Sequence, residues 1–104
     1  MERIESTGCS WAWVTVSRAL SRGPCELLYA QAISDGGEIK DTLLYAEENA
    51  TGELIMNFQM GANGNITLSP QTPIYCCRGL YAIVGDSTEG VFVQWRELGH
   101  KGGG

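Results

Sequence analysis

The sequence predicts an all-β protein, a single antiparallel β-sandwich of jelly-roll or immunoglobulin-like type with about seven strands. Three observations predict this fold class. Apolar runs of strand length recur at spacings of roughly 10–14 residues, and turn residues such as Gly, Pro, Asn and Asp separate them. No segment of helical length repeats its apolar residues with a period of 3.6. A chain of 104 residues is expected to form one domain.

The first expected strand shows a clear alternation. Ala12, Val14 and Val16 are expected on one side, and Trp11 and Trp13 face the other. Such a period of two is typical of a half-buried strand. All the expected strands, in order, span residues 11–20, 27–33, 39–45, 53–60, 65–69, 74–84 and 91–97.

The second and third expected strands form the strongest local signal in the chain. Residues 27–33 and 39–45 are two apolar runs that flank Asp35, Gly36 and Gly37. Because this turn is rich in residues that tolerate positive φ, the pattern predicts a β-hairpin.

The remaining strands are predicted from the alternation of apolar and polar residues and from the turn residues that interrupt it. Asn63 and Gly64 mark a turn, and Gly79 is expected to bend or bulge the long strand 74–84. The expected buried faces consist of Leu54, Met56, Phe58 and Met60 in one strand and of Val91, Val93 and Trp95 in the last. The domain is therefore expected over residues 11–97, with an N-terminal arm at 1–10 and a Gly-rich C-terminal tail at 98–104.

Charge and hydropathy exclude several classes of function. The net charge is −5, from 7 basic and 12 acidic residues, and the basic residues are scattered. Without a basic stripe, nucleic-acid binding is not expected. No apolar segment approaches the ~18 residues of a membrane span, so no membrane partner is expected. The first residues lack the pattern of a secretory signal, so we expect synthesis and folding in a cytosol.

The four cysteines, Cys9, Cys25, Cys76 and Cys77, lack the spacing of a zinc site. Cys76 and Cys77 are adjacent on an expected strand, so their side chains should point to opposite faces. The favoured interpretation is that all four are reduced and act as small apolar residues. The alternative is a single disulfide from Cys25 to Cys76 or Cys77, which makes sense only for a protein that works outside a cell.

No catalytic, cofactor-binding or metal-binding site is expected, and the chain is not expected to be an enzyme. His100 is the one histidine, and no nucleophile accompanies it in a catalytic pattern. Asp35, Glu38 and Asp41 could offer oxygen ligands to calcium, but their spacing matches no calcium loop. We interpret them as a solvated turn.

The tryptophans indicate assembly. Trp11 and Trp13 share one face of one expected strand. We interpret them as core residues or as subunit-contact residues. An edge strand that carries two tryptophans is a liability in a monomer, so we expect an oligomer or a larger assembly. The residues expected to contact a partner are Trp11 and Trp13, together with Arg3 and Ile4 of the arm. The same tryptophans could instead stack on sugar rings.

The order of motifs adds a resemblance. The motifs are Gly23-Pro24-Cys25-Glu26-Leu27-Leu28-Tyr29, Thr42-Leu43-Leu44-Tyr45, Arg78-Gly79-Leu80-Tyr81-Ala82 and Val91-Phe92-Val93-Gln94-Trp95. Over residues 22–97 the pattern resembles the small all-β virion proteins of tailed bacteriophages.

This resemblance implies a non-enzymatic structural role, most directly that of a capsid decoration (cement) protein that binds the capsid surface and stabilises the particle. It implies a homotrimer, a partner that is the major capsid protein or another virion protein, and a location in the virion after synthesis in the host cytoplasm. The alternative is a host-attachment or carbohydrate-binding β-sandwich module of a phage fibre or spike.

Overall fold

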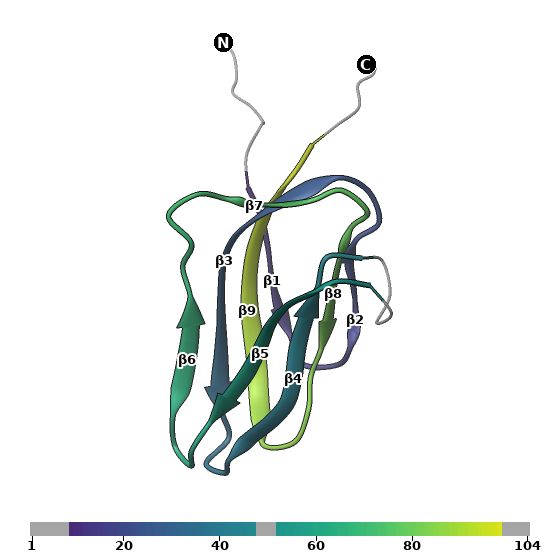
Figure 1. Ribbon diagram of the computed structural model, residues 1–104. Coiled ribbons are helices and arrows are strands. Elements are labelled where there is room, and N and C mark those ends of the chain that lie inside the picture. The colour runs from purple at the N-terminus through teal and green to yellow at the C-terminus, as the bar shows by residue number, and fades with distance from the viewer. Residues whose placement is uncertain (1–8, 48–51, 99–104) are drawn as a thin grey trace.

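The computed structural model describes residues 9–47 and 52–98 and contains two antiparallel sheets that face each other (Figure 1). Nine strands make up these parts of the chain, so the all-β, two-sheet prediction is confirmed and the count of seven is wrong. The strands are β1 (Ser10–Val14), β2 (Arg18–Ser21), β3 (Cys25–Ser34), β4 (Ile39–Tyr45), β5 (Leu54–Met60), β6 (Asn65–Leu68), β7 (Ile74–Cys76), β8 (Leu80–Ile83) and β9 (Thr88–Glu97). The described residues include no helix suited to spanning a membrane.

Most pairs of successive strands lie in opposite sheets. Sheet A has the order β1-β9-β3-β6, with β7 also paired to β3, and sheet B has the order β2-β8-β4-β5. The longest strands, β3 and β9, lie side by side at the centre of sheet A. The first described strand and the last are therefore neighbours.

The predicted hairpin of residues 27–33 and 39–45 is wrong. β3 belongs to sheet A and β4 to sheet B, so they do not pair, and Asp35-Gly36-Gly37 carries the chain from one sheet to the other. Gly36 does adopt a positive φ of 118°, as its place in the turn suggested. A tight turn rich in glycine serves a crossing between sheets as well as a hairpin, and local sequence does not separate the two.

Two expected strands are also broken by crossings between the sheets. Residues 11–20 divide into β1 and β2, and the expected inward residue Val16 is 66% exposed in the connection. Residues 74–84 divide into β7 and β8. Gly79 lies in that second connection with a φ of 128°, so its predicted role as a bend is confirmed.

A β-bulge keeps β3 in contact with the core along its whole length. The register with β9 shifts between Leu27 and Tyr29. Cys25 and Leu27 are buried before the shift, and Ala30 and Ala32 after it. The extra residue changes which side of the strand faces inward.

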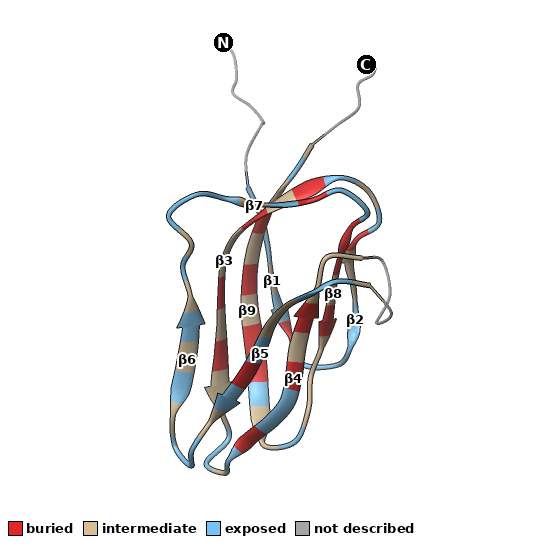
Figure 2. Cartoon of the chain, in the orientation of Figure 1, coloured by how far each residue is buried: buried red, intermediate tan, exposed pale blue. Residues whose placement is uncertain are grey.

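The core lies between the sheets (Figure 2). Its buried apolar members are Val14, Cys25, Leu27, Ala30, Ala32, Ile39, Leu44, Phe58, Cys76, Leu80, Ala82, Val91, Val93 and Trp95. The predicted inward face of β9 is thus confirmed. In β5 the prediction holds for Phe58, and for Met56 and Met60 in part, whereas Leu54 is exposed.

The expected arm and tail fall mostly outside the described residues. Of residues 1–10 the structure describes Cys9 and Ser10, and of residues 98–104 it describes Leu98. Arg3, Ile4 and His100 are not among them.

Candidate functional site

Sheet A presents a band of aromatic side chains on its outer face. β1 and β3 flank β9, and the register aligns Trp11 with Gln94 and Tyr29 in one row. The next row along the strands aligns Trp13 with Phe92 and Gln31. Opposed residues of a sheet point to the same side. We call Trp11, Trp13, Tyr29 and Phe92 the aromatic face.

The rings of the aromatic face are in contact across three strands. Phe92 lies between Trp11 and Tyr29, with ring centroids 6.0 Å from each. The Trp11 and Phe92 rings are tilted by 33°, and Tyr29 meets Phe92 edge-on at 62°. These are favourable geometries for aromatic pairs. The rings therefore support one another, but they do not share a plane.

Gly90 allows the Trp13 ring to pack closely against β9. A Cβ on Gly90 would lie 2.4 Å from Cζ2 of the Trp13 ring. The indole therefore lies directly against the backbone of β9, which only glycine allows. This contact holds Trp13 close to the sheet while leaving it 43% exposed.

The most exposed part of the aromatic face lies on an edge strand. β1 pairs with β9 alone, and its other side has no strand beside it among the described residues. Trp11 is 65% exposed. A free strand edge offers backbone N–H and C=O groups to another chain. The polar backbone edge and the exposed aromatic side chains of β1 thus lie next to each other.

Charge is absent from the centre of this surface and present at its end. The residues between the rings, Gln31 and Gln94, are neutral amides. Further along β3 and β9, Arg96 Nη1 lies 3.0 Å from Glu26 Oε1, so the two charges compensate each other. Such a neutral, aromatic surface suits contact with another protein surface better than with a charged polymer.

The structure places the two expected tryptophans together, on the outward face and on an edge strand. Tyr29 and Phe92 were missed by sequence reasoning. Phe92 could have been found, because it alternates with the inward residues Val91 and Val93. Tyr29 could not, because the bulge in β3 shifts the alternation just before it.

The acidic turn shows no arrangement for calcium. Asp35 Oδ1 accepts a hydrogen bond from the Gly37 N–H at 3.1 Å. Glu38 pairs with Lys40, with Oε1 and Nζ 3.3 Å apart. Within residues 9–47 and 52–98, no group of three or more metal-ligating side chains could hold a metal ion. Asp41 has a φ of 61° and lies in a β-bulge of β4.

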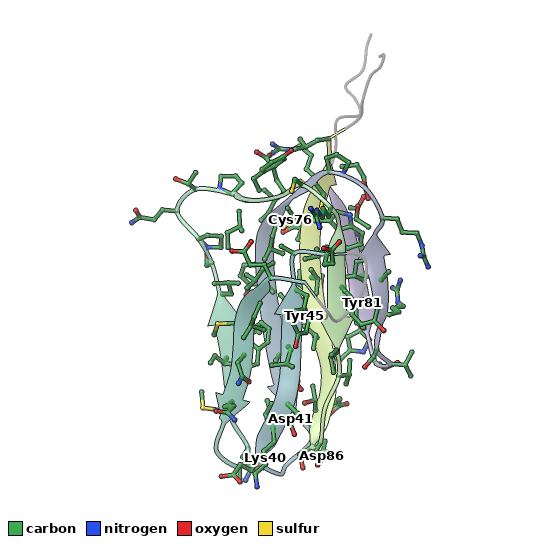
Figure 3. All side chains as sticks on the ribbon, turned by 45° about the vertical axis from the view of Figure 1, so that its right-hand side comes forward. Lys40, Asp41, Tyr45, Cys76, Tyr81 and Asp86 are labelled. Atoms are coloured by element: carbon green, nitrogen blue, oxygen red, sulfur yellow. The ribbon has the colours of Figure 1, made fainter. Side chains whose placement is uncertain are left out.

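A second cluster of reactive groups lies at the opposite end of the molecule from this turn. Figure 3 shows Cys76 at one end and Lys40, Asp41 and Asp86 at the other. Cys25 and Cys76 are both fully buried, whereas Cys9 and Cys77 are exposed. The opposite orientation predicted for Cys76 and Cys77 is therefore confirmed. All four are free thiols here.

The two buried thiols interact with each other. Their mutual hydrogen bond lowers the pKa of Cys25, although burial opposes this shift. The same hydrogen bond, followed by burial, raises the pKa of Cys76. The pKa values of the two thiols are thus shifted in opposite directions.

Comparison of the chain with protein-family models, curated proteins and solved structures gives no match.

Proposed function

We propose that this chain is a non-enzymatic structural protein of a bacteriophage virion, a capsid decoration (cement) protein that binds the capsid surface and stabilises the particle. The observation that supports the proposal best is the pair of exposed tryptophans, Trp11 and Trp13, on the free edge strand of sheet A. The proposal also draws on the resemblance of the strand pattern to small virion proteins.

The energetics of the aromatic face favour a protein partner. Tryptophan and tyrosine are enriched among the residues that dominate binding at protein interfaces. A fully buried aromatic side chain removes roughly 150–250 Å² from water, so covering two tryptophans supplies much of the driving force for association. The β1 edge can add backbone hydrogen bonds by accepting a further strand.

We propose further that the protein is a homotrimer whose partner is the major capsid protein or another virion protein. A jelly-roll or immunoglobulin-like topology remains part of this proposal, and the two packed antiparallel sheets support it. Light scattering coupled to size-exclusion chromatography at micromolar concentration tests the trimer. A monomer at that concentration contradicts the trimer without bearing on capsid binding.

Virions of the encoding phage provide the test of the main proposal. With Trp11→Ser and Trp13→Ser combined, we expect at least a tenfold loss of bound copies per particle, which corresponds to about 1.4 kcal/mol. Particles should also release their genome at a lower temperature. Quantitative mass spectrometry of purified particles and a thermal release assay measure both.

The matched control is Leu54→Ser, which removes an exposed apolar side chain from β5, at the edge of sheet B. It should leave occupancy unchanged. If particles that lack the protein withstand heat and osmotic shock as well as complete ones, the cement function is wrong.

Carbohydrate binding by a fibre or spike module is the second candidate, because Trp11 and Trp13 expose large ring surfaces. The tilt of 33° between Trp11 and Phe92 counts against a flat platform for a polysaccharide. A glycan array that shows specific binding, abolished by Trp11→Ser, would favour this candidate over the first. No binding, together with protection of both indoles from quenchers in the assembled protein, would remove it.

A further inference from the structure

β7 is the least secured strand of sheet A. It has three residues, and β3 is its only neighbour among the strands of residues 9–47 and 52–98. The pairing joins Leu27 to Ile74, Glu26 to Tyr75 and Cys25 to Cys76. Directly after Cys76 the chain leaves sheet A and crosses to β8 in sheet B. The last residue pair before this crossing is the pair of buried cysteines.

The register brings these two cysteines into the geometry of a disulfide. Directly opposed residues of antiparallel strands have Cα atoms about 4.5–5.5 Å apart. A disulfide requires a Cα separation of about 4.4–6.8 Å. Both side chains point to the same face, because both are fully buried in the core. Cys77 fails this requirement, since it lies in the turn after β7 and is exposed, whereas Cys25 is buried.

We propose that Cys25 and Cys76 form an intramolecular disulfide when the reduced protein meets a low-molecular-weight disulfide such as oxidised glutathione. This inference does not depend on the proposed virion function. It selects one of the two pairings that the sequence left open. The cross-link would fasten β7 to β3 and fix the point where the chain crosses between the sheets.

The reaction proceeds by two thiol–disulfide exchanges. The Cys25 thiolate attacks one sulfur of oxidised glutathione, and a glutathione thiolate leaves and takes up the proton that Cys25 released. The Cys76 thiolate then attacks the Cys25 sulfur of the mixed disulfide, and the second glutathione leaves and is protonated in turn. Two protein thiols are oxidised, and one glutathione disulfide is reduced to two thiols.

Access to the buried pair requires β7 to separate from β3. A three-residue strand with one neighbour opens locally at a small fraction of the free energy of global unfolding. Once β7 has separated, both thiols reach solvent, and the Cys25 thiolate can attack the glutathione disulfide. Oxidation should therefore be slow but should proceed in the folded protein.

The test uses the Cys9→Ser/Cys77→Ser variant, in which the two exposed thiols are absent and the buried pair is intact. After incubation with oxidised glutathione, we expect a product that has the mass of a single chain minus two hydrogens under denaturing conditions and that resists alkylation without reduction. Peptide mapping should identify the Cys25–Cys76 cross-link. Because the bond closes a loop of about 50 residues, the oxidised form should melt roughly 10 °C or more above the reduced form.

The Cys9→Ser/Cys76→Ser variant is the control, because it retains Cys25 and the exposed Cys77. It should form no intramolecular cross-link under the same conditions. The proposal is overturned if the buried pair of the first variant stays reduced after prolonged oxidation, or if the wild-type chain maps to a Cys25–Cys77 bond. Peptide mapping of the wild-type chain does not require any variant to fold.

Discussion

The two ends of the sandwich join sheet A to sheet B by different chemistry. At the end that contains β7, Ser21 of β2 donates a hydrogen bond to Glu97 Oε1 of β9 at 2.8 Å, beside the thiols of Cys25 and Cys76. We call this the cysteine end. At the opposite end, Thr42 of β4 lies 2.6 Å from Thr88 of β9, measured between the hydroxyl oxygens. We call this the turn end.

The turn end forms a directed chain of hydrogen bonds. The Gly85 N–H donates to the Thr42 hydroxyl at 3.0 Å, and the Thr88 hydroxyl donates to the Asp86 carbonyl at 3.3 Å. The proton between the two threonines must therefore come from Thr42. None of these groups changes its protonation or redox state near neutral pH, whereas thiols can change both. Of the groups that join the two sheets, only the thiols of the cysteine end can therefore change their protonation or redox state near neutral pH.

The largest effect is expected at the turn end from Gly85→Ala. A Cβ there would lie 2.1 Å from the Lys40 carbonyl oxygen, and backbone atoms cannot move aside cheaply. We expect a loss of about 3 kcal/mol in the free energy of unfolding, measured by urea denaturation. Gly23→Ala at the cysteine end is the control, because no atom lies within 4 Å of its added Cβ. Equal stability of the two variants would contradict the packing described for Gly85.

Thr42→Val should have the next largest effect. Valine keeps the shape but removes the buried hydroxyl, so the Gly85 N–H loses its acceptor and the Thr88 hydroxyl oxygen loses its donor. The expected loss is about 2 kcal/mol. Thr67→Val, at an exposed position of β6, should change stability far less. A neutral outcome for Thr42→Val would mean that the hydroxyl chain does not stabilise the turn end.

Ser21→Ala at the cysteine end should have the smallest effect of the three. It removes the hydrogen bond to Glu97, but that carboxylate keeps the indole N–H of Trp95, which donates to Oε2 at 2.8 Å. We expect a loss of about 1 kcal/mol by urea denaturation. The exposed Ser69→Ala is the control. A loss as large as that of Thr42→Val would show that the two ends are equally dependent on their hydroxyls.

The sequence predicted the class of fold and the shared face of the two tryptophans, because both depend on local alternation. Trp11 and Trp13 face outward, and Val91, Val93 and Trp95 face inward, at a period of two. The alternation within a strand indicates which of its sides is buried. It does not indicate which other strand pairs with that strand.

The pairing of strands was not predictable in this way. β3 and β4 have the composition of a hairpin, yet each contributes a buried face to a different sheet. Val16 continues the apolar alternation although it is exposed, so the sequence pattern did not indicate the crossing from β1 to β2. The pair Cys25 and Cys76 likewise follows from β3 pairing with β7, which is a contact between distant parts of the sequence.

The position of β9 sets the order in which the protein can be built. β9 lies between β1 and β3 at the centre of sheet A, and in the part of the chain that the structure describes β1 has no other neighbour there. At a translation rate of about 5–20 residues per second, the ribosome needs on the order of 4 to 17 s after completing β1 to produce β9. Throughout this interval the tryptophans of β1 have no sheet to join. Sheet A is therefore completed only after its last strand has left the ribosome, and the nascent chain must be kept from aggregating until then.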